Sequence, residues 1–537
     1  MKKKQLRWTL WTIASPFILF IILCILIYLP PIQNFLVDKA AVYASEATGM
    51  NISVGRISLS FPLNLVVTDV DAASPHKDTL LSVRRLQVNV QLLPLLKKQV
   101  EVDGISLQGA TVNSNDLIHG MRLNGTLGEL FISSHGVALD PETAIVNKVL
   151  LKDTDLSLCL NDTAAADTAA SDTTYWKIIL QDIDLQNVSF ALDMPLDSLS
   201  LAASLDNAIL RDGLIDLHKS AYSLQTFRIK NGRVRYDSGR PSATASADSL
   251  SAGLDPSHIA LTDIGVKLDS LYYEGRNMKA IISQFVLKER SGVEIVSTEG
   301  RLVSNDKVLR VPSLKLETRD SYLELNAAMD WDALDFKKEG LVSARLMADI
   351  GKPDVVRFMG SMDEKFIRKY PSEPLRIRTG IDGDLNKLKL TTLTAELPGA
   401  LELFAKGELT SLTDSLLRGG DITLQAETKD LKFISTLAEG IEIPYGTRLE
   451  GKFTMAGPKM GTDLLLMQPE AHAVAAADTI PMTVYNDSIS VADDFKMERA
   501  ARLFAKYDLS RDRYEADLAV NHFDLHQFMP ADSLYTL

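Results

Sequence analysis

The segment Asn51–Val70 reads Asn-Ile-Ser-Val-Gly-Arg-Ile-Ser-Leu-Ser-Phe-Pro-Leu-Asn-Leu-Val-Val-Thr-Asp-Val, and its apolar residues recur with a period of about two. In a β-strand, alternate side chains point to the same side of the sheet. The segment therefore predicts strands with one apolar face, as in antiparallel sheets. The apolar residues of this alternation are Ile52, Val54, Ile57, Leu59, Phe61, Leu63, Leu65, Val67 and Val70.

The same alternation extends over most of the 537-residue chain. It returns at residues 80–90 and 100–107 and then runs from Tyr175 to Val520, with short loops of Gly, Asn and Asp between the strands. No long helical pattern lies between them, which argues against an α/β enzyme. We predict a mostly β protein whose elongated, curled antiparallel sheet forms a groove with a few short helices.

A low-complexity stretch divides this β-rich part. Residues 161–174 contain no large apolar side chain and cannot contribute to a core, so we expect a disordered loop there. The predicted organisation is an N-terminal β domain at residues 50–160 and a repetitive β-groove region at residues 175–537.

Residues 8–29, upstream of the strands, carry no charge and are long enough to cross a bilayer as a helix. The basic residues Lys2, Lys3, Lys4 and Arg7 are expected to keep residues 1–7 in the cytoplasm, so that the rest of the chain is exported. A cleaved signal peptide is the alternative. Its apolar core is shorter and ends in small residues, whereas this one ends in Leu29, Pro30 and Pro31.

Residues 30–49 show apolar side chains at helical spacing before Gly49. They predict an amphipathic helix. This helix either packs into the core or lies along the outer leaflet next to the membrane anchor.

A short pattern recurs three times in the second half of the chain. An alternating strand is followed by Asp, an apolar residue directly after it, and another apolar residue four positions after the Asp. Each Asp is expected to cap a short helix that plugs one edge of the sheet. Repeated units of this kind indicate a quasi-linear architecture. The plug-helix candidates are Asp354 and Phe358, Asp430 and Ile434, and Asp524 and Phe528.

Composition and motifs exclude several classes of function. The net charge of −13 argues against nucleic-acid binding, which needs a basic surface. The two cysteines are Cys24 in the predicted membrane span and Cys159 in the exported part, so no internal disulfide is expected there. No nucleophile, phosphate-loop or metal-ligand motif occurs, and we expect neither an enzyme nor a cofactor. The acidic pairs Asp153/Asp155 and Asp382/Asp384 are interpreted as turn residues.

An Asp-Ser/Thr-apolar tripeptide recurs along the chain. It resembles an O-glycosylation signal of one Gram-negative group, and Thr163 and Thr168, within the low-complexity stretch, are the best glycan candidates. Ordinary turn chemistry, in which Asp and Ser end a loop before a strand, is the alternative.

Several N-terminal features follow one another in a characteristic order. They are an N-terminal anchor, a helix ending in Thr48-Gly49, Val54-Gly55-Arg56-Ile57-Ser58-Leu59, Phe61-Pro62-Leu63-Asn64-Leu65, Asp78-Thr79-Leu80-Leu81, Leu92-Leu93-Pro94-Leu95-Leu96 and Gly104-Ile105-Ser106-Leu107-Gln108-Gly109-Ala110. This order resembles the AsmA/TamB family of envelope proteins. The resemblance covers residues 1–115. Longer relatives continue into a further domain, so the chain is either a fragment or a shorter member of this family.

The resemblance implies a single-pass inner-membrane protein of Gram-negative bacteria with its bulk in the periplasm. It also implies that an apolar groove delivers phospholipid to the outer membrane. The alternative is an assembly factor for outer-membrane β-barrel proteins with a barrel partner, and a third reading is an anchored scaffold with a closed core. The lipid-groove candidates are Ile57, Leu59, Phe61, Leu65, Val67, Val88 and Val90.

Overall fold

The computed structural model describes residues 50–60, 64–74, 79–91, 102–114, 121–138, 142–160, 175–239, 253–335, 338, 340–359, 364–412, 414–436, 442–469 and 497–521, together with Lys39, Ala41, Val42, Ser45 and Phe528. Of these residues 73% are in strands, so the prediction of a mostly β protein is confirmed. The chain divides into two compact units, residues 1–246, 256–275 and 287–290 in the first and residues 247–255, 276–286 and 291–537 in the second.

The strands of the first unit are hydrogen-bonded side by side in chain order, except that β10 pairs with β8. The short strand β9 pairs with the ends of β8 and β11. The strands are β1 (Asn51–Ser60), β2 (Asn64–Ala73), β3 (Thr79–Val90), β4 (Val102–Asn113), β5 (Met121–Ala138), β6 (Thr143–Leu160), β7 (Lys177–Met194), β8 (Leu199–Asp216), β9 (Ala221–Leu224), β10 (Thr226–Ser238) and β11 (His258–Glu274). β12 (Asn277–Glu289) contains residues of both units.

One strand pair departs from the predicted antiparallel pattern. β6 and β7 are parallel, with Thr143 opposite Lys177 and Cys159 opposite Asp193. Parallel neighbours need a crossover connection of a dozen or more residues instead of a tight turn. Residues 161–176 separate these two strands and have that length. The low-complexity stretch at 161–174 itself lies outside the described residues.

A line of irregular positions crosses the first unit at one level of its strands, and we call it the crease. At the crease each strand has one residue that makes no ladder pair, yet the register is the same on both sides from β1 to β10. An extra residue bends a strand and increases its twist. Here both strands of each neighbouring pair have such a residue at the same level. The crease residues are Gly55, Asp69, Arg84, Gly109, Gly128, Asp153, Asn187, Asp206 and Asn231.

Left-handed backbone explains the residue type at several positions of the crease. Asp69, Asp153, Asn187 and Asn231 have φ between 49° and 61° there. Among non-glycine residues, Asn and Asp tolerate this conformation best. Asp153 and Asp155 lie within β6, and Asp382 lies within β17 (Leu375–Gly383), so the interpretation of these three as turn residues was wrong. Asp384 does lie in a turn, where its carboxylate accepts hydrogen bonds from the backbone N–H groups of Asn386 and Lys387.

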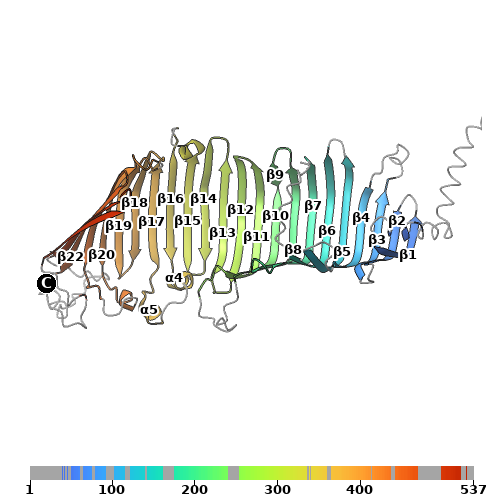
Figure 1. Ribbon diagram of the computed structural model, residues 1–537, viewed down its shortest axis with the longest axis horizontal. Coiled ribbons are helices and arrows are strands. Elements are labelled where there is room, and N and C mark those ends of the chain that lie inside the picture. The colour runs from blue at the N-terminus through green and yellow to red at the C-terminus, as the bar shows by residue number, and fades with distance from the viewer. Residues whose placement is uncertain are drawn as a thin grey trace, which may run out of the picture. The chain divides into compact units, whose positions relative to one another are not determined.

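The second unit continues as a regular antiparallel meander in which each strand from β13 to β24 pairs with the next. Figure 1 shows these strands side by side. They are β13 (Glu294–Ser304), β14 (Val308–Thr318), β15 (Ser321–Asp330), β16 (Val342–Ile350), β17 (Leu375–Gly383), β18 (Lys387–Leu397), β19 (Leu401–Thr410), β20 (Gly419–Thr428), β21 (Arg448–Ala456), β22 (Lys459–Pro469), β23 (Met497–Asp508) and β24 (Arg513–Val520).

Short helices lie between strands of the second unit. Two of them are 3₁₀ turns, η1 (Trp331–Leu334) and η2 (Ile434–Thr436). The α-helices are α4 (Lys352–Met359) and α5 (Glu364–Lys369), which lie beyond the ends of β16 and β17 (Figure 1).

The predicted N-terminal segments fall almost entirely outside the described residues. Residues 1–7 and 8–29 are not described, and within 30–49 Lys39, Ala41, Val42 and Ser45 are helical. Among the residues that the structure describes, no helix combines the length and apolar character needed to cross a bilayer.

Candidate functional site

Two rows of apolar side chains run across the first unit at right angles to its strands. In each row every residue lies opposite the next one in the β-ladder. The first row is Leu59, Leu65, Val88, Ile105, Ile132, Val149, Ile183, Leu210, Phe227 and Leu268; the second is Ile57, Val67, Leu86, Leu107, Leu130, Leu151, Leu185, Ala208, Ile229 and Val266. Ten strands spaced by about 4.8 Å give each row a length of roughly 43 Å.

The opposite face at the same level is mainly polar. Its row next to the crease contains no apolar side chain; the members are Arg56, Thr68, Arg85, Gln108, Glu129, Lys152, Gln186, Asn207 and Lys230. Its row between the two apolar rows also carries Val66, Phe131, Leu150 and Ile209. Alternation along the strands therefore separates an apolar face from a mainly polar face.

The apolar face is only partly shielded. Of the twenty residues in its two rows, Ala208 is buried, with 4% of its surface exposed, and the others are all half-buried. Neighbours on the same face give this degree of cover, whereas a second packed layer would bury large apolar side chains almost completely. In the described part of the first unit, no second layer packs on this face.

The second unit carries a matching apolar row. It crosses eleven strands, with small and large side chains mixed, and Ala348 is its one buried member. The row is Leu316, Leu323, Ala348, Ile377, Ala395, Leu403, Ala426, Leu449, Leu466, Ala501 and Val520. Exposure increases toward β24, where Val520 is 41% and Leu518 66% exposed.

The polar face of the second unit is held by ion pairs between neighbouring strands. Arg378 contacts Asp349 at 2.7 Å, Arg345 contacts Asp382 at 2.7 Å, and Arg502 contacts Asp463 at 2.6 Å. The hydrogen bond from Arg345, with a second from Ser343, keeps the pKa of Asp382 below its usual value. Exposed pairs of this kind contribute little to stability, but they make this face hydrophilic.

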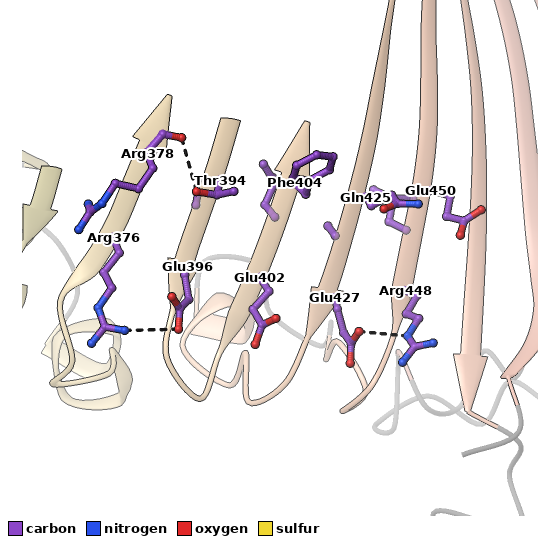
Figure 2. A pocket seen from close by; sticks show the side chains of 14 residues that line it. Arg376, Arg378, Thr394, Glu396, Glu402, Phe404, Gln425, Glu427, Arg448 and Glu450 are labelled. Atoms are coloured by element: carbon purple, nitrogen blue, oxygen red, sulfur yellow. Dashed lines mark hydrogen bonds and ion pairs between the residues drawn. The ribbon is translucent and has the colours of Figure 1, made fainter. Parts of the chain in front are cut away.

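A hollow of about 880 Å³ lies on this polar face across β17–β21. Figure 2 shows charged side chains lining it, with Arg376 paired to Glu396 at 3.5 Å and Arg448 to Glu427 at 3.1 Å. Glu402, between these pairs, binds Lys429 at 2.8 Å. The hollow is therefore lined mainly by polar side chains, several of them ion-paired, with Phe404 as its aromatic member.

One edge of the apolar face in the second unit is closed by a group of side chains that we call the edge cluster: Phe366, Tyr370, Leu397, Ala400, Leu431 and Phe433. Its three aromatic rings pack with centroids 5.1–5.7 Å apart. The strand-end residues Leu375 and Leu401, which lie on the apolar face, pack against it. The apolar face thus runs directly into the edge cluster.

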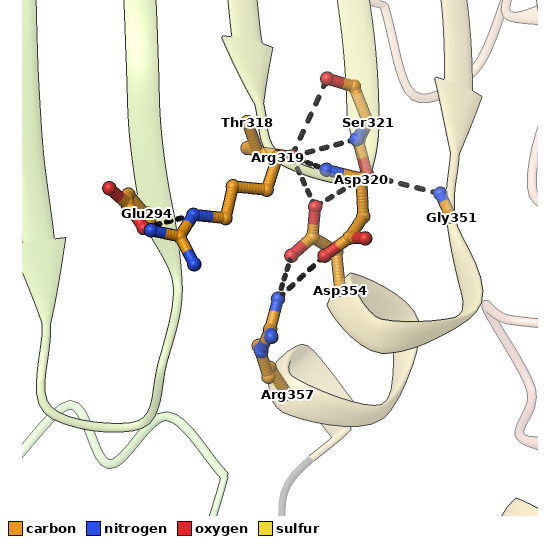
Figure 3. A network of polar contacts seen from close by, with 8 residues as sticks. All are labelled: Glu294, Thr318, Arg319, Asp320, Ser321, Gly351, Asp354 and Arg357. Carbon is orange, nitrogen blue, oxygen red and sulfur yellow. Dashed lines mark hydrogen bonds and ion pairs between the residues drawn. The ribbon is translucent and has the colours of Figure 1, made fainter.

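A buried carboxylate fixes α4 beside this edge. Asp354 is fully buried and accepts hydrogen bonds from the hydroxyls of Thr318 and Ser321 and from Arg357 Nη1 at 2.9 Å (Figure 3). Arg357 also binds Asp320 at 3.0 Å. Because α4 begins at Lys352, Asp354 lies inside the helix, and the expectation that it caps the helix was wrong. Its carboxylate instead accepts hydrogen bonds from the hydroxyl groups of Thr318 and Ser321, on either side of the β14–β15 turn.

The other plug-helix candidates are placed differently from one another. Phe358 is on α4 and 56% exposed. Asp430 accepts a hydrogen bond from the N–H of Lys432, and Ile434 begins η2 and packs on the edge cluster. The carbonyl of Phe528 accepts a hydrogen bond from the N–H of Glu442 at 2.7 Å. Asp524 lies outside the described residues.

The lipid-groove candidates lie together. Leu59, Leu65 and Val88 belong to the first apolar row, and Ile57 and Val67 belong to the second. Val90, at the end of β3, lies opposite Val102 of β4. Phe61 and the glycan candidates Thr163 and Thr168 are outside the described residues.

Sequence reasoning did not identify the edge cluster or the crease. The sequence does carry a signal for the crease. Where a strand crosses it, two successive apolar residues are three positions apart instead of two, as in Val54-Gly-Arg-Ile57 and Leu185-Gln-Asn-Val188. The cluster joins residues from three separate connections, and no local pattern in the sequence links them.

Comparison with known proteins adds no family to these observations: neither the family models nor the curated proteins that were searched match the chain. In the described residues no group of three or more His, Cys, Asp or Glu side chains is arranged to hold a metal ion.

Proposed function

We propose that the protein is an inner-membrane-anchored periplasmic carrier that holds the acyl chains of phospholipids on its apolar sheet face and passes them toward the outer membrane. The observation that carries this proposal is the pair of uninterrupted, half-buried apolar rows across ten strands of the first unit. The matching row of the second unit supports it. The resemblance of residues 1–115 to the AsmA/TamB family agrees with this function.

The chemistry of the face favours hydrocarbon over a protein segment. In a sheet, backbone N–H and C=O groups pair within the plane, so the face presents side chains alone. Along the apolar rows those side chains are aliphatic or aromatic and offer no hydrogen bond. A peptide would bury its own polar backbone there at a cost, whereas acyl chains gain about 0.8 kcal/mol for each CH₂ group removed from water.

Many equivalent positions suit transport better than one deep pocket. Each strand adds an apolar side chain at about the same height, so a chain shifted by one strand spacing of about 4.8 Å meets a similar surface. Cargo would therefore move along the rows between sites of similar affinity. The lining residues would be interchangeable in size, as the mixture of Leu, Ile, Val and Ala in the rows allows.

The experiment compares two adjacent residues of β4. Leu107 lies in the second apolar row and Gln108 in the polar row of the opposite face. We expect Leu107→Glu to deplete the phospholipid that co-purifies with the full-length protein and Gln108→Glu to leave it unchanged. Equal lipid content in both variants would refute the proposal.

A further inference from the structure

We infer that cargo lipids lie in one orientation in the second unit, with the ends of their acyl chains at the edge cluster and their headgroups at the opposite ends of β17–β19. This inference rests on the proposed function and adds to it the direction in which the lipid sits. It follows from a difference between the two ends of the same three strands.

At one end the apolar face meets a water-excluding surface. Leu375 begins β17, Leu397 ends β18 and Leu401 begins β19, so these three apolar-face residues share one edge. Leu397 is 4% exposed because the edge cluster covers it, and Ala400 in the adjoining turn is completely buried. A charged or zwitterionic headgroup placed here would lose its water without gaining partners, which is strongly unfavourable.

At the other end the same face stays open. Gly383, Leu388 and Leu409 lie opposite one another across β17–β19, and none of the three is fully buried. The strands end there in exposed turns. Asp384 in the β17–β18 turn and Asp414 in the β19–β20 turn each accept a hydrogen bond from a backbone N–H group, and Leu416 and Leu417 of the second turn are 76% and 71% exposed. In this described region, no buried apolar group comparable to the edge cluster covers these strand ends.

The distance between the two ends suits acyl chains that lie along the strands. From Leu401 to Leu409 in β19 is eight residues, or about 26 Å at roughly 3.3 Å per residue. The hydrocarbon of one membrane leaflet is about 15 Å thick, half of a bilayer core of roughly 30 Å. With its headgroup region, one leaflet is about 20–22 Å thick, half of a bilayer of roughly 40–45 Å. A phospholipid whose chain ends lie at the edge cluster therefore keeps both chains on the apolar face and places its headgroup in the part of the face nearest the open edge.

Two buried or half-buried hydrogen-bonding contacts also hold the edge cluster in place. Lys352 Nζ donates a hydrogen bond to the carbonyl of Tyr370 at 2.7 Å, and the buried Asp354 holds α4 to the β14–β15 turn. Through α4 and α5 both contacts hold the cluster in place over the ends of β17–β19. A fixed end wall is what a defined lipid orientation requires.

The test uses two photoreactive phospholipids of the same chain length on the full-length protein. One carries a diazirine at the end of an acyl chain and the other carries it in the headgroup. After illumination, modified peptides are identified by mass spectrometry. We expect the tail probe to label residues around Leu375, Leu397 and Leu401 and the headgroup probe to label residues around Leu388 and Leu409, each with an excess of about tenfold, since each CH₂ left in water is disfavoured roughly fourfold.

The outcomes separate this inference from the proposed function. Labelling by both probes at the same strand ends, or in the reverse order, overturns the orientation while lipid binding stands. Absence of labelling by either probe on the apolar faces of both units overturns the proposed function. A Phe433→Ala variant provides a second readout, because loosening the cluster should spread tail-probe labelling beyond this edge. The matched control Phe404→Ala, on the polar face, should leave the pattern unchanged.

Discussion

Val149 in β6 lies directly opposite Ile183 in β7, and this pair carries the first apolar row across the one parallel junction found among the ladders described here. The change in strand direction therefore does not interrupt the apolar face. In a parallel pair, residues in register still point to the same side of the sheet, so the row continues into β8 at Leu210.

The parallel register can be tested with a native cysteine. Cys159 lies opposite Asp193, and directly paired strand residues are close enough for a disulfide. In a Cys24→Ser background we expect Asp193→Cys to form a disulfide with Cys159 on oxidation, and Lys177→Cys at the other end of β7 to form none. An antiparallel β6–β7 hairpin would give the reverse result on a non-reducing gel.

Backbone conformation at the crease predicts a specific pair of stability changes. Asn231 has φ 61°, a conformation that glycine adopts freely and that β-branched residues avoid. We expect Asn231→Val to lower the free energy of unfolding by about 1–2 kcal/mol and Asn231→Gly to change it by less than about 0.5 kcal/mol. Urea denaturation of the two variants measures both values. Equal costs would mean that the left-handed backbone is not what this position requires.

The buried carboxylate of Asp354 should matter far more than its repeat counterpart Asp430. Asp354→Ala leaves Arg357 and two hydroxyls without their shared acceptor, and we expect a loss of about 3 kcal/mol. Asp430 is exposed, and Asp430→Ala should cost about 0.5 kcal/mol. Denaturant unfolding followed by circular dichroism measures both changes. Similar losses in the two variants would contradict the network assigned to α4.

Tyr370 predicts an alkaline limit to stability. Burial raises the pKa of its phenol, because the charged form is poorly solvated inside the edge cluster. The folded protein therefore favours the neutral phenol. The stability that this preference contributes is fully present below the unfolded pKa of about 10, and it is lost as pH rises through the raised folded pKa. The urea midpoint should fall above about pH 10, and less so in Tyr370→Phe. Tyr514→Phe, at an exposed position, should behave as wild type.

The sequence was sufficient to predict the strands and the apolar face, because alternation is a local property. Leu59 and Leu65 were assigned to one face from their spacing alone, and the ladder places them opposite each other. The parallel β6–β7 pair could not be predicted, since residues 161–174 give the length of the connection but not its path.

The mid-strand crease was missed for a different reason. Asp and Asn are read by default as turn residues, and Asp153 and Asn187 adopt a turn-like φ while remaining inside long strands. The edge cluster depends on Phe366 and Phe433 meeting across about 70 residues of chain, a non-local contact that no spacing rule gives.

The central claim is that the apolar face binds lipid, and adjacent residues of β19 test it most directly. Leu403 lies in the apolar row of the second unit, and Phe404 lies on the polar face near Lys406. The measurement is the amount of phospholipid, by mass spectrometry, bound to full-length protein carrying Leu403→Glu or Phe404→Glu. We predict strong depletion with Leu403→Glu and none with Phe404→Glu. Undiminished lipid on a correctly folded Leu403→Glu protein, or no lipid on the unaltered protein, would contradict the account.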